Sequence, residues 1–316
     1  LQVYNASYIS VFGQQNDASG GAALDFDILL EPPNVAHSAF CLLASTGALR
    51  LSLFGKDDVT KRPPPMDALT RGILSMQRQD GAFRIEFGCE NVYKGVEFYP
   101  GEAMVALMEV YNLSASMPGI LDDSTRQAIL PAMKRAFYFY ADFYHQGNVD
   151  VNYNIWQVQA FTRLFLALHS NENEQHRNLA TLLANYILEL CHDIVESRSW
   201  KELARGPSFY PNLETVEIAC GLDAVAQGIC VAQKVSRDME GKLFWTNAEN
   251  AVNFLKTVQD QVPPEVTGSG GLGYGGIQVL EQRLDVTGHA ISALTKVFQV
   301  QDNGTCHHHH HQCPFK

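Results

Sequence analysis

The chain has 316 residues, is 46% hydrophobic and carries a formal net charge of −11 at pH 7. It is long enough to bury a sizeable core, as one large domain or two ordinary ones. The acidic balance and the lack of a Lys/Arg-rich run argue against nucleic acid or an anionic membrane as main partner. No apolar run approaches the roughly 20 residues of a membrane-spanning helix, so no membrane span is predicted.

Apolar residues recur at helical spacing along most of the chain and predict nine helices of two alternating kinds. Those at odd positions in the series are rich in small and apolar residues and poor in charge, which is typical of buried helices. Those at even positions are charged and amphipathic. In chain order the nine ranges are 34–45, 66–79, 100–111, 122–146, 153–168, 173–197, 214–233, 246–261 and 286–299.

This alternation repeats about every 55 to 65 residues, as stacked supersecondary units do. Helical hairpins with one inner and one outer helix, curved until their ends meet, form an α/α barrel. We therefore predict an all-α fold, an α/α toroid of five or six hairpins over residues 34–300. Residues 1–33 form an N-terminal extension, either short strands or a partial hairpin, and 301–316 form a His- and Cys-containing tail.

Each predicted inner helix carries one polar residue near its start. Aligned by eye, these residues form a column of His37, Glu102, Gln157, Glu217 and His289. In a closed ring of hairpins the N-termini of the inner helices meet at one end, so the column would line one cavity. Helix N-termini carry partial positive charge, which suits anionic or hydroxyl-rich ligands.

Further polar and aromatic residues gather just before these positions. Aromatic faces beside carboxylates and amides are what a sugar site requires. The junction residues are Glu97, Tyr99, Tyr153, Asn154, Trp156, Glu214, Arg283 and Asp285, and Tyr274 follows a glycine-rich turn at 268–273. That turn matches G-x-G-x-x-G, but prolines rather than a strand precede it, so no dinucleotide cofactor is predicted.

The motifs "QRQDGAF" (77–83), "YPGEAMVAL" (99–107) and "GGLGYGG…RLDVTGHAISAL" (270–294) give the chain a resemblance to the α/α-toroid superfamily. That group includes six-hairpin glycosidases, uronate-acting lyases and epimerases, sugar 2-epimerases and terpene cyclases. The resemblance implies a carbohydrate-active protein that acts on an oligosaccharide or a uronic-acid-containing glycan. The acidic motifs of terpene cyclases are not matched, and neither is the zinc-ligand set of protein prenyltransferases, so no metal is predicted.

Three functions stay open on the sequence alone. Glycoside hydrolysis needs two carboxylates, for which Glu102, Glu217 and Asp285 are candidates. A lyase or epimerase needs an acid/base pair, such as His289 with His37 or Tyr153, and a cation such as Arg283 to hold the substrate carboxylate. The third possibility is a non-catalytic toroid, which binds a ligand or a protein partner as a scaffold or as a subunit of a larger assembly.

The cysteines and glycosylation motifs bear on the compartment. Three sequons, at Asn5, Asn112 and Asn303, favour a secreted or luminal protein. Seven cysteines are present, and the apolar helical settings of Cys191, Cys220 and Cys230 predict buried free thiols.

Overall fold

The computed structural model describes residues 34–51, 66–87, 95–147, 151–170, 173–260 and 284–303. This part of the chain is helical, and the only β-pairing in it consists of two isolated bridges, Asn34–Glu86 and Gln77–Phe83. The all-α fold class is therefore confirmed for the described residues. The extension at 1–33, the last residues of the tail, Tyr274 and Arg283 lie outside them.

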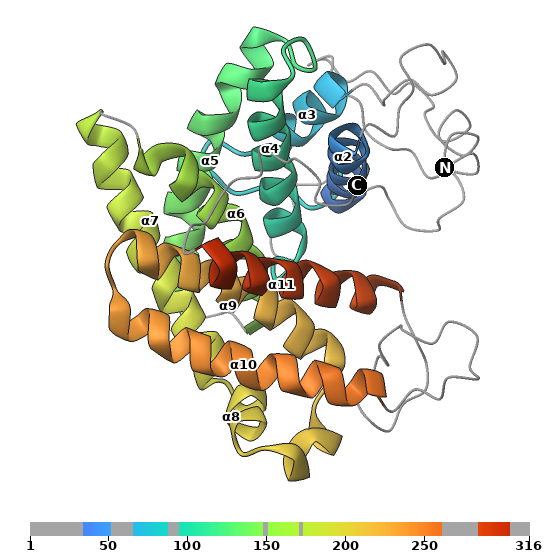
Figure 1. Cartoon of the computed structure of the whole chain (residues 1–316). Coiled ribbons are helices and arrows are strands. Elements are labelled where there is room, and N and C mark those ends of the chain that lie inside the picture. The colour runs from blue at the N-terminus through green and yellow to red at the C-terminus, as the bar shows by residue number, and fades with distance from the viewer. Residues whose placement is uncertain are drawn as a thin grey trace. The chain divides into compact units, whose positions relative to one another are not determined.

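Both kinds of predicted helix are present in the predicted order (Figure 1). The helices poor in charge are α2 (Val35–Arg50), α4 (Tyr99–Ser116), α6 (Val151–His169), α9 (Thr215–Lys234) and α11 (Leu284–Asn303). The amphipathic helices are α3 (Met66–Ser75), α5 (Asp123–His145), α7 (Glu174–Glu196) and α10 (Asp238–Asp260). Two short elements not expected from the sequence, α8 (Arg198–Ala204) and the 3₁₀ helix η2 (Pro207–Asn212), separate α7 from α9.

Several helix boundaries differ from the expected ranges, most of all the start of α10. Helix α10 begins at Asp238 rather than at residue 246, because acidic residues in its first turn suit a helix N-terminus. Helix α5 keeps close to its expected range and contains Pro131 in its interior. Among the described helices, α9 is long and apolar enough to cross a membrane by length and composition. Because 83% of the tested stretch is buried inside the fold, α9 has the setting of a core helix.

The chain divides into two compact units, residues 1–156 and 157–316, with the boundary inside α6. In the first unit α2 packs against α3 and α4, and α5 packs against α3 and α4. In the second unit α7, α10 and α11 all pack against α9 (Figure 1). Because three helices pack against it, α9 is mostly buried and carries only three charged residues in its 20, Glu217, Asp223 and Lys234.

The "QRQDGAF" motif is a closed turn that ties α3 to α5. The Nε2 of Gln77 donates to the carbonyls of Gly81 at 3.0 Å and Ala132 at 2.9 Å. Gly81 has φ +103°, and a Cβ there would lie 2.3 Å from the carbonyl oxygen of Arg135. The backbone N–H of Phe83 donates to the hydroxyl of Tyr140 at 3.0 Å. In this structure the residues of the motif therefore hold the fold together.

A buried charged cluster fastens α11 to α9 in the second unit. Asp223 of α9, which is 2% exposed, is paired with Lys296 and accepts a 2.9 Å hydrogen bond from Ser292 Oγ, both on α11. Gln227 Nε2 also donates to Asp223 Oδ1 at 3.2 Å. Burial alone would raise the pKa of Asp223, but Lys296, Arg163 and Ser292 together hold this pKa below its usual value.

The cysteines match the sequence expectation in part. Cys41, Cys191 and Cys220 form no disulfide; Cys191 is buried with its Sγ close to Gly228 of α9, whereas Cys220 is half-buried rather than buried as predicted. Burial raises the pKa of the Cys41 thiol to about 11, so this group is inert at neutral pH. The free-thiol prediction is wrong for Cys230, which is disulfide-bonded.

Candidate functional site

Three buried polar side chains occupy the same position at the start of three helices. Ser38, Glu102 and Asn154 are the fourth residues of α2, α4 and α6, and they are 0%, 6% and 2% exposed. Within the described part of the chain, Ser38 Oγ, Glu102 Oε2 and Asn154 Oδ1 have no hydrogen-bond partner. A buried polar atom without a partner is costly, so three at equivalent positions point to a ligand site.

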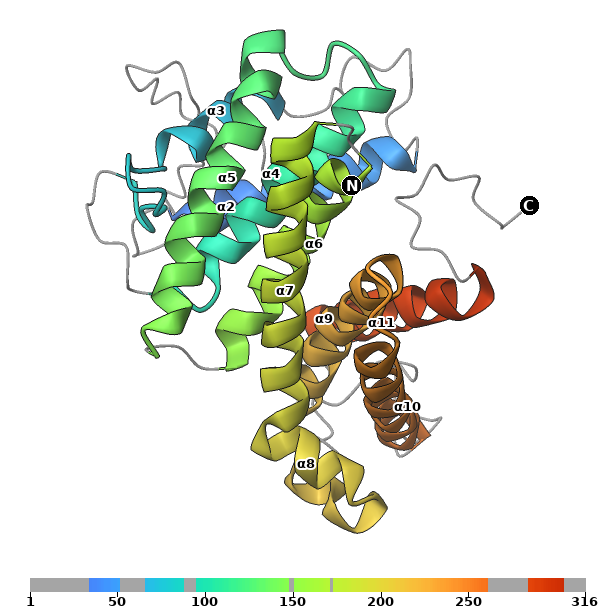
Figure 2. The same ribbon diagram turned by 90° about the vertical axis from the view of Figure 1, so that its left-hand side faces the viewer.

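Packing within the first unit joins α2 to α4, and the start of α4 to α6. Helices α2 and α4 lie side by side (Figure 2). The ion pair of Arg50 with Glu109 joins the last turn of α2 to α4 just past its midpoint. Gly101, next to Glu102, lies against Trp156 of α6, where a Cβ would approach the Trp156 Cβ to 2.3 Å. The first turn of α4 therefore packs on the start of α6, and Gly101 is required for that approach.

Glu102 is the chemically distinctive member of the set. Burial raises the pKa of its carboxyl to about 8. A helix N-terminus favours the charged form of an acid, so burial outweighs the helix dipole at this position. The carboxyl is therefore protonated at pH 7, and a neutral carboxylic acid is the state that a general acid requires.

Aromatic residues flank Glu102. Tyr99, in the same turn of α4, and Trp156 are each half-buried, as is Glu97 just before the helix. The ring of Tyr99 lies over Gly95, where a Cβ would come within 2.6 Å of it. The partly exposed rings of Tyr99 and Trp156 have the apolar faces on which sugars pack.

Two other predicted residues of the first unit are engaged in local structure. Tyr153 is fully buried, and its hydroxyl donates to the Tyr140 carbonyl at 2.6 Å. His37 is half-buried and forms a capping box with Asn34, whose backbone N–H donates to His37 Nδ1 at 3.4 Å. Both serve folding here, and their roles in binding stay predictions.

The predicted residues of the second unit differ widely in burial. Gln157 is fully buried, and among the described residues neither atom of its amide group has a partner. Glu217 is half-buried and accepts a 2.9 Å hydrogen bond from Ser199 Oγ, whereas Glu214 is exposed at the N-cap of α9. Asp285 lies in the first turn of α11, and His289 is half-buried one turn later.

Sequence reasoning missed Ser38, although it follows His37 directly. When positions are counted from the first residue of each helix, Ser38 and Asn154 are equivalent to Glu102. The column aligned from the sequence contained His37 and Gln157 instead. Only a count from the observed first residues corrects this register. A buried serine within an apolar helix also gives no signal of its own in the sequence.

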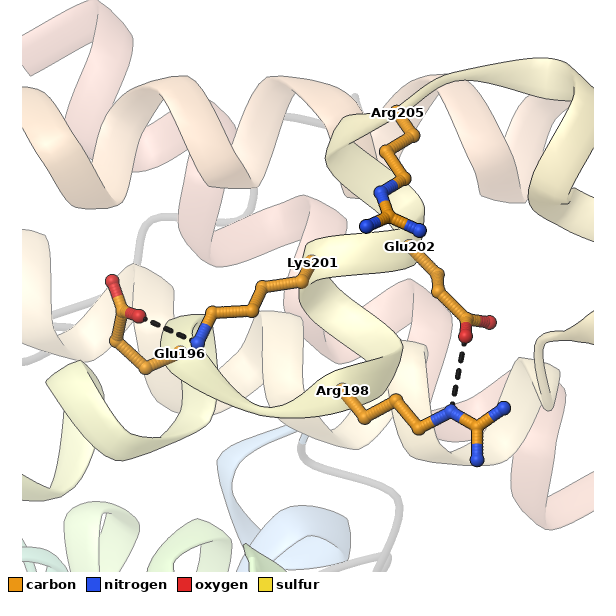
Figure 3. A pocket seen from close by; sticks show the side chains of 5 residues that line it. All are labelled: Glu196, Arg198, Lys201, Glu202 and Arg205. Carbon is orange, nitrogen blue, oxygen red and sulfur yellow. Dashed lines mark hydrogen bonds and ion pairs between the residues drawn. The ribbon is translucent and has the colours of Figure 1, made fainter.

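A surface hollow of about 310 Å³ lies at the junction of α7 and α8 (Figure 3). Its side chains pair with one another, Lys201 with Glu196 at 2.9 Å and Arg198 with Glu202 at 3.0 Å. Arg198 is 90% exposed, so water competes strongly with any ligand for these charges. The hollow is therefore a solvated ion-pair surface and a weaker candidate than the Glu102 site.

Comparison with known protein families and with curated proteins finds no match for this chain. Among the described residues, no group of three or more His, Cys, Asp or Glu side chains is placed to hold a metal ion. The function is therefore argued from the Glu102 site itself.

Proposed function

We propose that the chain is an α/α toroid that processes carbohydrate, with Glu102 as its general acid. The toroid is supported by the alternation of the more buried helices α2, α4, α6 and α9 with the amphipathic helices α3, α5, α7 and α10 along the chain. The chemistry is supported above all by the setting of Glu102, a buried carboxyl whose Oε2 has no hydrogen-bond partner and whose pKa burial raises to about 8. Glycoside hydrolysis uses a pair of carboxyl groups, and a carboxyl that keeps its proton near neutral pH is typical of the general acid in that pair.

In this proposal the Glu102 carboxyl gives its proton to the oxygen of the glycosidic bond as that bond breaks. A second carboxylate then acts as base or nucleophile on the opposite face of the sugar. In the first unit its candidate is Glu97, whereas Glu217 and Asp285, the other carboxylates predicted from the sequence, belong to the second unit. In the lyase or epimerase version, His289 removes a proton beside a substrate carboxylate that Arg283 holds.

Substrate binding would use the neighbours of Glu102. The ring faces of Tyr99 and Trp156 offer apolar contact to a sugar, and Asn154 and Ser38 offer hydrogen bonds to its hydroxyls. A hydroxyl both donates and accepts, so it can satisfy the unpartnered Asn154 Oδ1 and Ser38 Oγ. No cofactor is needed for this chemistry.

A non-catalytic binding scaffold is the second candidate, and one observation favours it. Two members of the predicted column are held by neighbouring residues, His37 by the capping box and Glu217 by Ser199. A scaffold would keep the ligand site around Glu102 but lack a second free acid or base.

A screen of binding and cleavage over neutral and uronic oligosaccharides separates these candidates. For an enzyme, Glu102→Gln lowers turnover by about 10²–10⁴-fold, since the amide cannot donate the proton. The matched control is Glu174→Gln, which changes an exposed glutamate in the first turn of α7 and should leave turnover unchanged. Binding without cleavage by the wild type would support the scaffold, and no binding at all would refute both.

A further inference from the structure

We infer that the surface hollow at the junction of α7 and α8 binds a phosphate group. The hollow lies in the second unit, so this inference goes beyond the proposed function and does not depend on it. It is carried by the cations that line a hollow of about 310 Å³, and by how few of their hydrogen-bond donors are used there.

The lining of the hollow is richer in cations than in acids. Among the described residues that line it, Arg198, Lys201 and Arg205 are cations, whereas Glu196 and Glu202 are acids. The chain as a whole carries a formal net charge of −11. Salt at physiological concentration screens the repulsion from acids farther away than about 8 Å, so the cations of the hollow decide which ligand is attracted.

Arg205 is the cation best placed to receive an anion. Its Cζ lies 5.3 Å from the centre of the Phe209 ring. Within the part of the chain that the structure describes, both carboxylates of the hollow pair with other cations, and no dashed line reaches Arg205 in Figure 3. Stacking on a ring orients a guanidinium and leaves its in-plane N–H donors available. Arg205 therefore offers oriented donors without first breaking an ion pair.

The other two cations can turn toward an anion at little cost. Arg198 contacts Glu202 through its Nε at 3.0 Å, and its two Nη groups point away from that carboxylate (Figure 3). The side chains of Lys201 and Glu196 are 59% and 62% exposed. Exposed ion pairs contribute little to stability, and a phosphate group carries more charge than a carboxylate. Exchange of Glu196 for phosphate as the partner of Lys201 is therefore favourable.

A phosphate group fits this set of donors better than a carboxylate does. Its oxygens are arranged tetrahedrally and can meet two arginine forks and a lysine together, whereas one fork already satisfies both oxygens of a carboxylate. Because the hollow is open to water, which competes for these charges, we expect a Kd on the order of 1 mM.

The test is an NMR titration of the full chain with inorganic phosphate at pH 7 and constant ionic strength. We expect the signals of residues 196–205 to shift and saturate with a Kd on the order of 1 mM. Arg205→Gln should weaken phosphate by about tenfold, because it removes charge-assisted hydrogen bonds. The matched control is Arg177→Gln, which removes the same charge from an exposed arginine in the first turn of α7 and should leave the Kd unchanged.

Two results would overturn the inference. One is the absence of a saturable shift at phosphate concentrations well above the expected Kd, and the other is equal weakening by Arg205→Gln and Arg177→Gln. A second titration with a hexose phosphate identifies the source of the group. If binding is weakened by Arg205→Gln alone, tighter binding of the hexose phosphate supports a phosphate ester as ligand, and equal binding supports free phosphate. Neither titration bears on Glu102, so the proposed function stands or falls separately.

Discussion

At the scale of single residues, the proton on Glu102 links stability to pH. The unfolded chain loses this proton near the ordinary pKa of 4.5, whereas the folded protein keeps it up to about pH 8. Between these values the folded state binds one proton more than the unfolded state, so stability falls as pH rises. The slope for one group is about 1.4 kcal/mol per pH unit at most.

We therefore expect Glu102→Gln to flatten the fall in stability between pH 5 and pH 8. The variant should be no less stable than the wild type at pH 5 and clearly more stable at pH 8, because the amide needs no proton to stay neutral. Denaturant unfolding of both proteins at several pH values measures this, with Glu174→Gln as control. Parallel profiles would show that Glu102 is ionised at neutral pH.

The pKa of Asp223 is shifted in the opposite direction to the pKa of Glu102, because Lys296 balances the buried charge of Asp223. Removing one partner leaves the other charge buried and unpaired, which costs about 3–5 kcal/mol. We expect Lys296→Met to destabilise the second unit by that order, and Asp223→Leu combined with Lys296→Met to recover most of the loss. A double-mutant cycle of unfolding free energies measures the coupling, and additive losses would refute it.

At the scale of elements, Gly101 sets how closely α4 approaches α6. An alanine Cβ there would lie 2.3 Å from the Trp156 Cβ, so Gly101→Ala should cost about 1–3 kcal/mol of stability through overpacking. Gly47, inside α2, has open space where an alanine Cβ would lie, with no neighbouring atom within 4 Å. Gly47→Ala should therefore stabilise the protein by about 0.5–1 kcal/mol. Thermal unfolding of both variants tests this contrast in sign.

The helices were predictable because their signals are local. Burial on most sides leaves α9 with few charged residues, and one-sided burial gives α5 and α7 their helical period. The short elements α8 and η2 were not predictable, because seven and six residues are too few to show a period. Their place depends on packing, as where Trp200 of α8 lies against Gly221 of α9.

The candidate site was predictable only in part. Glu102, Asn154 and Trp156 were identified because a polar or aromatic residue at the start of an apolar helix stands out. Ser38 was missed, since the register between repeats depends on where each helix begins. The sequence also cannot distinguish Tyr153, whose hydroxyl donates a hydrogen bond to the Tyr140 carbonyl, from an aromatic residue that contacts a ligand.

At the scale of the whole molecule, each compact unit has a buried polar feature with a different purpose. The Asp223 cluster in the second unit is internally satisfied, and we assign it to stability. The Ser38, Glu102 and Asn154 set in the first unit is unsatisfied, and we assign it to ligand binding. The contrast between satisfied and unsatisfied polar groups is the basis on which a function is proposed.

The measurement that tests the central claim most directly compares leaving groups. Turnover of a cleaved oligosaccharide is measured beside turnover of the same sugar on an aryl leaving group that departs without a proton. If Glu102 is the general acid, Glu102→Gln loses about 10²–10⁴-fold on the oligosaccharide and far less on the aryl glycoside. Equal losses on both substrates, or none on either, would contradict a role for Glu102 as proton donor.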